Sequence, residues 1–283
     1  DYSIIDYAGG MADVAAGLLR IIGDPDTRYR EDPVRMLRVV RFATKLGFRL
    51  EAATEAPIAR LAPLLGDIPP ARLFDEMLKL FMGGKALANF EMLRQYGLFE
   101  QLFPMTERSL GRDDNYFQAL VSRGMANTDT RIEQGKPVTP AFLFAVFLWQ
   151  PVRERAAQLE AEGQQPALAL QHAGAQVIAE QAGVMATPRR FSLPMREIWM
   201  LQLRLEIKGG RRSKRVLGHP RFRAAYDFLL LRAEAGEVPD ELGDWWTEFQ
   251  EINPQEPVQT TSRPRPRKRR RNRSRRKPEV KAE

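Results

Sequence analysis

Apolar residues recur every three to four positions along most of the chain, and this spacing predicts α-helices rather than β-strands. The segment 33–46 is the clearest case, because its apolar residues share one stripe and Gly47 follows as a stop signal. The stripe comprises Met36, Leu37, Val39, Val40 and Ala43. The segment 71–82, ahead of Gly83-Gly84, repeats the pattern with four residues predicted to point inward: Leu73, Met77, Leu78 and Phe81.

Helical spacing continues beyond these two segments. It predicts further helices over 85–96, 115–126, 140–150, 151–160, 166–182, 194–208, 220–235 and 240–250. Strand signals are confined to the first 22 residues, where 2–7 and 18–22 are candidates for short strands joined by a turn at Gly9-Gly10. The expected fold is mostly α, with a short α/β part at the N-terminus. The aromatic residues of 142–149 lie on nearly every face, which predicts burial in a core rather than base stacking.

Composition excludes several classes of protein. The chain has no Cys and two His, which excludes disulfides, iron–sulfur sites and thiol catalysis and disfavours a zinc site or a Ser-His-Asp triad. The longest apolar run, 141–149, is less than half of the ~20 residues that a membrane-spanning helix needs. No secretory signal opens the chain. A cytoplasmic protein without a membrane partner is expected.

Charge is distributed unevenly. The net charge is +8, but 12 basic and 2 acidic residues lie in 263–283, so that 32 basic and 34 acidic residues remain in 1–262. From Asn253 onward apolar residues nearly vanish and prolines recur, which predicts a disordered tail. Its cations would bind RNA phosphates by counterion release; a generic polyanion-binding or solubilising tail is the alternative. The candidate RNA-binding residues are Arg263, Arg265, Arg267, Lys268, Arg269, Arg270, Arg271, Arg273, Arg275, Arg276 and Lys277.

A second basic cluster lies at 208–215, around Gly209-Gly210. It contains Lys208, Arg211, Arg212, Lys214 and Arg215. Two interpretations are equally open for it: a continuation of an RNA track, or a solvated loop between helices.

The densest motif spans 28–48. Arg35, Arg38 and Arg41 fall within about 120° on the side of the helix opposite its apolar stripe, where forked guanidinium donors suit phosphates. An acceptor such as Asp32 beside Arg35 can read the hydrogen-bonding edge of a base. The alternative is structural: Asp32 caps the helix, Pro33 is its first residue, and the arginines form a solvated face.

This motif, together with 6–13 and 22–25, resembles the class II nucleotidyltransferases, and among them the bacterial poly(A) polymerases, with the CCA-adding tRNA nucleotidyltransferases as close relatives. The resemblance continues more loosely through 68–76, 103–104, 127–131, 140–144, 219–227 and 245–246. It implies a head remnant over 1–27, a neck and RNA-binding domain over 28–110, a helical body over 111–252 and a basic tail over 253–283.

The resemblance also implies an activity, the template-independent addition of AMP from ATP to RNA 3′ ends. The Glu-Asp-x-x-Arg signature of the family falls on Glu31, Asp32 and Arg35, which would select the base, with Arg38 in support. Arg28 and Arg41 are weaker candidates for the same pocket. Implied partners are RNA 3′ ends, ATP, and RNA-decay proteins recruited by the tail.

The chain departs from the family at the catalytic carboxylates. These follow a Gly-Ser turn as Asp-x-Asp and hold two Mg²⁺ ions, but Asp24-Pro25-Asp26 is the only Asp-x-Asp here, and proline disrupts a strand. Asp113-Asp114 falls in a predicted loop. The catalytic and metal-binding residues are therefore expected upstream of Asp1, in a longer protein, and this chain alone is expected to be inactive. A CCA-adding enzyme and a non-catalytic helical RNA-binding protein remain the alternatives.

Overall fold

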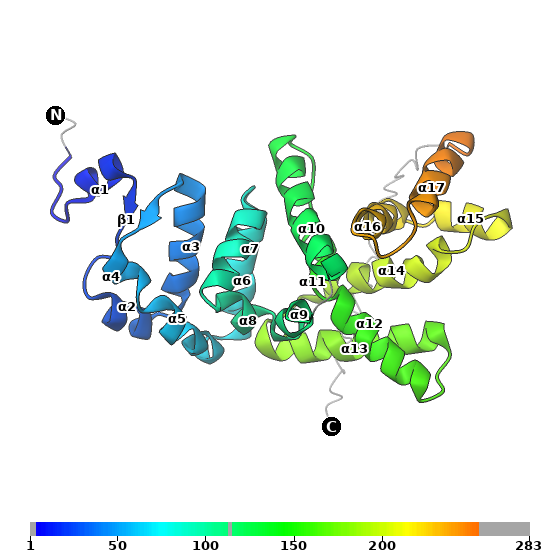
Figure 1. Ribbon diagram of the computed structural model, residues 1–283, viewed down its shortest axis with the longest axis horizontal. Helices are drawn as coiled ribbons and strands as arrows, with labels where there is room; N and C mark the ends of the chain where they lie inside the picture. The colour runs from blue at the N-terminus through cyan, green and yellow to red at the C-terminus, as the bar shows by residue number, and fades with distance from the viewer. Residues whose placement is uncertain (1–3, 113–114, 255–283) are drawn as a thin grey trace, which may run out of the picture.

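Residues 4–112 and 115–254 are described by the computed structural model of the chain, and most of them are helical, as predicted. The helices follow one another along an elongated molecule, from α1 at one end to α15 and α17 at the other (Figure 1). The tail predicted to be disordered, including all its candidate RNA-binding residues, lies outside the described residues, as do Asp113 and Asp114.

Two short strands and ten helical segments precede residue 112. They are α1 (Gly10–Ala16), β1 (Leu18–Leu19), α2 (Pro25–Glu31), α3 (Val34–Leu46), β2 (Arg49–Leu50), α4 (Ala52–Glu55), α5 (Ile58–Leu61), the 3₁₀ helix η1 (Ala62–Asp67), α6 (Pro70–Phe81), α7 (Ala86–Gln95), α8 (Leu98–Leu102) and α9 (Pro104–Leu110). The part from residue 115 is helical: α10 (Asn115–Glu133), α11 (Pro140–Phe147), α12 (Trp149–Ala161), α13 (Pro166–Val184), α14 (Arg189–Leu205), α15 (Gly210–Leu217), α16 (Phe222–Glu234) and α17 (Asp240–Ile252).

The N-terminal strands differ from the prediction. A strand does form at Leu18–Leu19, but its parallel partner is Arg49–Leu50, which the sequence pattern did not indicate. The predicted strand over 2–7 is wrong for its described residues 4–7, and Gly10 begins a helix. The cause is Asp6, whose carboxylate accepts hydrogen bonds from the backbone N–H groups of Ala8, Gly10 and Met11 and so organises a helix start.

A buried threonine fastens this strand pair to the helices beside it. Thr54 accepts a hydrogen bond from the Ile21 N–H at 3.1 Å through its hydroxyl, which itself donates to Glu51 at 2.7 Å. The Thr54 carbonyl accepts a hydrogen bond from the Tyr29 hydroxyl at 2.8 Å. Three segments, 18–21, α2 and α4, are therefore held together at one residue.

Several predicted boundaries fail in the C-terminal part. The helix predicted over 115–126 continues to Glu133 as α10. The helix predicted to begin at Pro194 begins at Arg189 and runs through that proline as α14. The interpretation of 208–215 as a loop is wrong for its greater part, because residues 210–217 form α15. Ser213, Val216 and Leu217 are buried, and packing of this narrow face stabilises the helix. The sequence pattern did not indicate this helix, because most of its residues are basic.

The main hydrophobic core contains a cluster of phenylalanine rings, where the aromatic residues of α11 meet those of earlier helices. The ring of Phe147 is centred 4.6 Å from Phe103, 5.2 Å from Phe81 and 5.4 Å from Phe99. Phe144, Phe147 and Trp149 are buried, which confirms their assignment to the core. A second, smaller cluster surrounds Trp246, between α14, α16 and α17.

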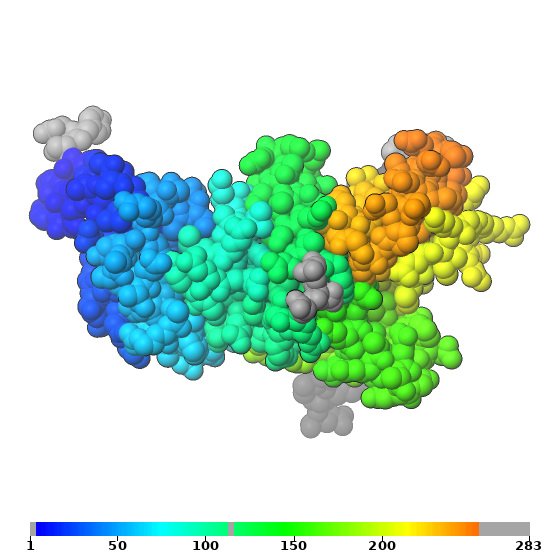
Figure 2. All heavy atoms as spheres, viewed as in Figure 1, coloured from blue at the N-terminus to red at the C-terminus, as the bar shows by residue number. Residues whose placement is uncertain are grey.

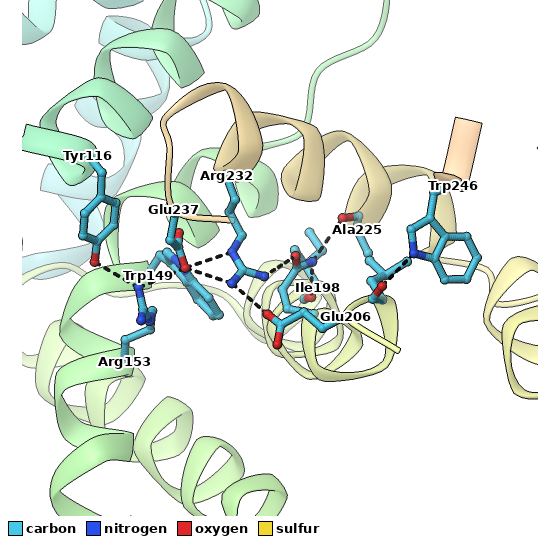
Figure 3. Close-up of polar contacts among 11 residues, drawn as sticks. Tyr116, Trp149, Arg153, Ile198, Glu206, Ala225, Arg232, Glu237 and Trp246 are labelled. Atoms are coloured by element: carbon cyan, nitrogen blue, oxygen red, sulfur yellow. Dashed lines mark hydrogen bonds and ion pairs between the residues drawn. The ribbon is translucent and has the colours of Figure 1, made fainter. Parts of the chain in front are cut away.

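A buried ionic network lies between the two clusters (Figure 3). Arg232 of α16 is 5% exposed at its side chain, and its guanidinium pairs with Glu237 at 2.9 Å and with Glu206, the residue after α14, at 2.8 Å. Glu237, 3% exposed, also accepts hydrogen bonds from the Trp149 indole and from Arg153. The Arg232 guanidinium lies 4.9 Å from the centroid of the Trp149 ring. The network thus joins α12, α14 and α16.

Candidate nucleotide-binding site

The candidate site begins at the corner where α2 ends and α3 starts. Asp32 adopts an extended conformation between the two helices, and its carbonyl accepts a hydrogen bond from the Arg35 N–H at 3.0 Å. No side chain caps the start of α3, so the prediction that the Asp32 carboxylate is the helix cap is wrong. That carboxylate is turned toward α6 instead.

Arg72 of α6 holds one oxygen of Asp32. Its Nη2 donates to Oδ2 of Asp32 at 2.8 Å. The other oxygen, Oδ1, is buried and has no hydrogen-bond partner among the described residues. An unpaired buried carboxylate oxygen is costly, so a ligand N–H group that reached this atom would relieve that cost.

Glu31 organises two of the predicted arginines. Its Oε2 pairs with Arg28 at 2.6 Å and lies 3.7 Å from Nη1 of Arg35. The Arg28 Nε is buried and has no partner within the described part of the chain. The Arg35 side chain is 27% exposed, and its pairing with Glu31 through Nη1 alone leaves other guanidinium donors for a ligand.

Arg38 is held by a buried carboxylate that the sequence analysis did not identify. Glu76 of α6 is 3% exposed at its side chain and lies 3.5 Å from Arg38 and 2.8 Å from Lys79. Leu78, predicted to point inward, is partly buried and packs against the main core. A charge pattern was available as a signal, because Arg72, Glu76 and Lys79 recur at helical spacing along α6.

Arg41 lies apart from these ion pairs. Its guanidinium stacks on the neighbouring Phe42 ring at 4.5 Å, and its Nε is buried without a hydrogen-bond partner in the described structure. The structure therefore brings Glu31, Asp32, Arg28 and Arg35 together, adds Arg38 through Glu76, and leaves Arg41 at the margin. An acceptor next to forked donors can bind the edge of a base, and the flanking guanidinium groups can bind phosphate.

The Asp24-Pro25-Asp26 segment has a structural role. Asp24 caps α2 by accepting hydrogen bonds from Thr27, and the Thr27 hydroxyl lowers the pKa of this carboxyl. Asp26 pairs with Arg60 and with Arg30. Within residues 4–112 and 115–254 no group of three His, Asp or Glu residues is placed to hold a metal ion. The residues present thus do not fit a two-metal centre.

A pH-dependent contribution to stability is expected from Asp26. The hydrogen bond from Arg60, and then that from Arg30, hold its pKa below the ordinary value of 3.8. A lowered carboxyl pKa stabilises the fold above the unfolded-state value, and this stabilisation is lost as the pH falls below it. Urea unfolding of Asp26→Asn should therefore show a lower midpoint than wild type at pH 7, with the difference narrowing as the pH is lowered below 3.8. Asp75→Asn, an exposed control on α6, should show the same small difference at pH 7 and at the lower pH values.

Family profiles match two parts of the chain. The family described as "Polymerase A arginine-rich C-terminus" matches residues 162–278, and that described as "Probable RNA and SrmB-binding site of polymerase A" matches residues 47–110. No helix among the described residues is both long enough and apolar enough to span a membrane.

Curated proteins agree with these profiles, and a solved structure shares the fold. The chain is 44% identical to Poly(A) polymerase I of Salmonella typhi over 263 residues, which are 90% of this chain and 56% of that protein. It is 35% identical to the CCA-adding enzyme of Bacillus subtilis over 44% of this chain and 32% of that enzyme. The Thermotoga maritima CCA-adding enzyme in complex with tRNA shares the fold, with a TM-score of 0.55 and 18% identity over 87% of this chain and 54% of that one.

The match to the poly(A) polymerase covers about twice as much of the chain as the match to the CCA-adding enzyme. The chain spans about half the length of the curated poly(A) polymerases that it matches. With both profiles drawn from polymerase A, the chain belongs to the family of bacterial poly(A) polymerases.

Proposed function

We propose that this protein acts in the addition of AMP from ATP to RNA 3′ ends, and that residues of this chain select the base and make many of the contacts with RNA. The observation that carries the proposal is a carboxylate oxygen without a partner, one helical turn before a half-buried arginine: Oδ1 of Asp32 has no partner among the described residues, and the Arg35 guanidinium lies 3.7 Å from Glu31. Adenine, like cytosine, presents an amino donor next to a ring nitrogen acceptor, which complements a carboxylate acceptor with a guanidinium donor.

The α6 side chains support this assignment. Arg72 fixes the Asp32 carboxylate through its second oxygen, and Glu76 fixes Arg38 from the buried side. A base-selecting pair gains precision when neighbouring groups lock its rotamers. We assign Glu31, Asp32, Arg35 and Arg38 to the nucleotide, with Arg28 and Arg41 at its phosphate side.

We also propose the division into a head remnant (1–27), a neck and RNA-binding domain (28–110), a body (111–252) and a basic tail (253–283). RNA binding by residues 263–277 and recruitment of RNA-decay proteins by the tail stay predictions, as does a cytoplasmic location. Because the described residues offer no metal centre, the Mg²⁺ chemistry implied by the family is assigned to other residues, and this chain alone should not incorporate nucleotides.

A primer-extension assay tests the function. The full-length gene product should extend a short RNA with ATP into a long tail and use CTP, GTP and UTP poorly, whereas this chain alone should bind the RNA without extending it. A tRNA trimmed of its CCA end discriminates the alternative: if the full-length protein restored CCA there and then stopped, the protein would be a CCA-adding enzyme. Extension by this chain alone would instead place catalytic carboxylates within it.

A further inference from the structure

The basic residues of α14 and α15 differ from most others in lacking anionic partners. The segment 189–215 has two carboxylates, and both pair outside it: Glu197 with Arg221 at 2.9 Å and Glu206 with Arg232 at 2.8 Å. Its own cations form no ion pair with any carboxylate of the described residues. They are Arg189, Arg190, Arg196, Arg204, Lys208, Arg211, Arg212, Lys214 and Arg215.

The four arginines of α14 share one face. At 100° per residue they fall within about 120°, opposite the buried Ile198, Trp199 and Leu205, and they extend over about 22 Å of helix. Three of them are exposed and Arg196 is half-buried. Arg190 also stacks over the ring of Phe191 at 4.8 Å, which keeps its guanidinium flat against the surface.

The glycine pair before α15 directs a second set of cations outward. Gly209 and Gly210 have φ angles of 92° and 75°, a turn that residues with a Cβ rarely adopt. The helix then buries its narrow apolar face and leaves all four of its cations exposed on the opposite side. In Figure 2 this segment forms the outermost edge of the C-terminal end of the molecule.

We propose that the outer face of α14 and α15 is a binding surface for the sugar-phosphate backbone of single-stranded RNA. This surface begins near α6, where the Phe191 ring of α14 lies 5.7 Å from that of Phe74, and ends with α15 at the opposite end of the molecule from α1 (Figure 1). Unpaired cations in a row release counterions when they meet phosphates, and forked guanidinium donors hold them. Insertion into a lipid surface is disfavoured, because such helices expose an apolar face and that of α15 is buried. The proposal rests on the proposed function for the kind of polyanion, RNA.

The test is the salt dependence of RNA affinity in the full chain. Fluorescence anisotropy of a labelled 20-nucleotide oligo(A) gives Kd at several salt concentrations for wild type and for the variant with Arg211→Gln, Arg212→Gln, Lys214→Gln and Arg215→Gln. Loss of these phosphate contacts should reduce the slope of log Kd against log salt by about 2 to 3. At 0.1 M salt, affinity should fall at least about tenfold.

A matched control distinguishes the effect of this particular surface on RNA affinity from the effect of the net charge of the chain. Lys45→Gln, Arg123→Gln, Lys136→Gln and Arg155→Gln remove the same charge from exposed positions outside α14–α15, and this variant should change the slope by less than about 0.5. A charge-conserving variant, with Arg211→Lys, Arg212→Lys and Arg215→Lys, should keep the wild-type slope, because lysine still binds phosphate as a point charge. Circular dichroism checks that each variant is folded.

Two outcomes overturn the proposal. One is an equal loss of affinity in the glutamine variant and in its control. The other is an unchanged slope in the glutamine variant, including the case in which it loses binding to anionic vesicles or to acidic peptides instead. Neither outcome affects the selection of ATP in primer extension, so a failure here is distinguishable from a failure of the proposed function.

Discussion

Replacing Glu237 with Ala should lower the free energy of unfolding by about 3–5 kcal/mol, because it leaves the Arg232 guanidinium buried without its nearest buried counter-charge. The same change removes the acceptor of the Trp149 indole N–H, which lies in a buried position. Chemical denaturation followed by far-UV circular dichroism measures the effect.

Glu206 provides the matched control for this prediction. It pairs with the same arginine, but its side chain is 41% exposed, so water can replace it. Glu206→Ala should therefore cost about 1 kcal/mol or less. The double variant Arg232→Met/Glu237→Leu should cost less than Glu237→Ala alone, since no unpaired charge remains. Equal costs for Glu206→Ala and Glu237→Ala would contradict the account of a buried network.

Replacing Arg35 with Ala in the full-length protein should lower kcat/KM for ATP by about 10²-fold and reduce the preference for ATP over CTP. The estimate takes the loss of a charged, forked hydrogen-bond donor as about 3 kcal/mol. Initial rates of primer extension with each nucleotide measure this loss, while the Kd for the RNA primer should change by less than about twofold.

Two comparisons test whether the effect of Arg35→Ala is specific to nucleotide selection. Arg30→Ala removes another ion-paired arginine from the same corner, but its partner is Asp26 rather than a candidate site residue, so ATP selection should be retained. Deletion of 263–283 should do the reverse of Arg35→Ala, weakening RNA binding and its salt dependence while leaving nucleotide preference unchanged. If Arg35→Ala and the deletion affected both parameters alike, the proposed division of labour would be wrong.

The sequence was most informative where helical spacing and stop signals coincide. The helix over 33–46 and its buried stripe are confirmed, because Gly47 ends it with a φ of 68° and the five predicted residues are buried. The strand at Arg49–Leu50 could not be predicted from its own residues, since two residues carry no periodicity and the pairing depends on a partner 31 positions away.

The sequence predicted only the part of the candidate site that lies within residues 28–41. The Glu-Asp-x-x-Arg motif indicated Glu31, Asp32 and Arg35, but their partners on α6 belong to the tertiary structure. Glu76 in particular is buried although it is charged, and a pattern of apolar residues assigns such a position to the surface. The direction of the Asp32 carboxylate was likewise decided by Arg72, which offers a stronger partner than the N–H groups of α3.

The parallel pairing of β1 with β2 has a consequence for the order of folding. The two strands close a chain loop that contains α2 and α3, and the closure of such a loop carries an entropic cost that grows with its length. Helices α2 and α3 form from local contacts and shorten the distance that the strand ends must cover. The strand pair and its bonds at Thr54 are therefore expected to form after α2 and α3, which carry the Glu31, Asp32 and Arg35 part of the candidate site.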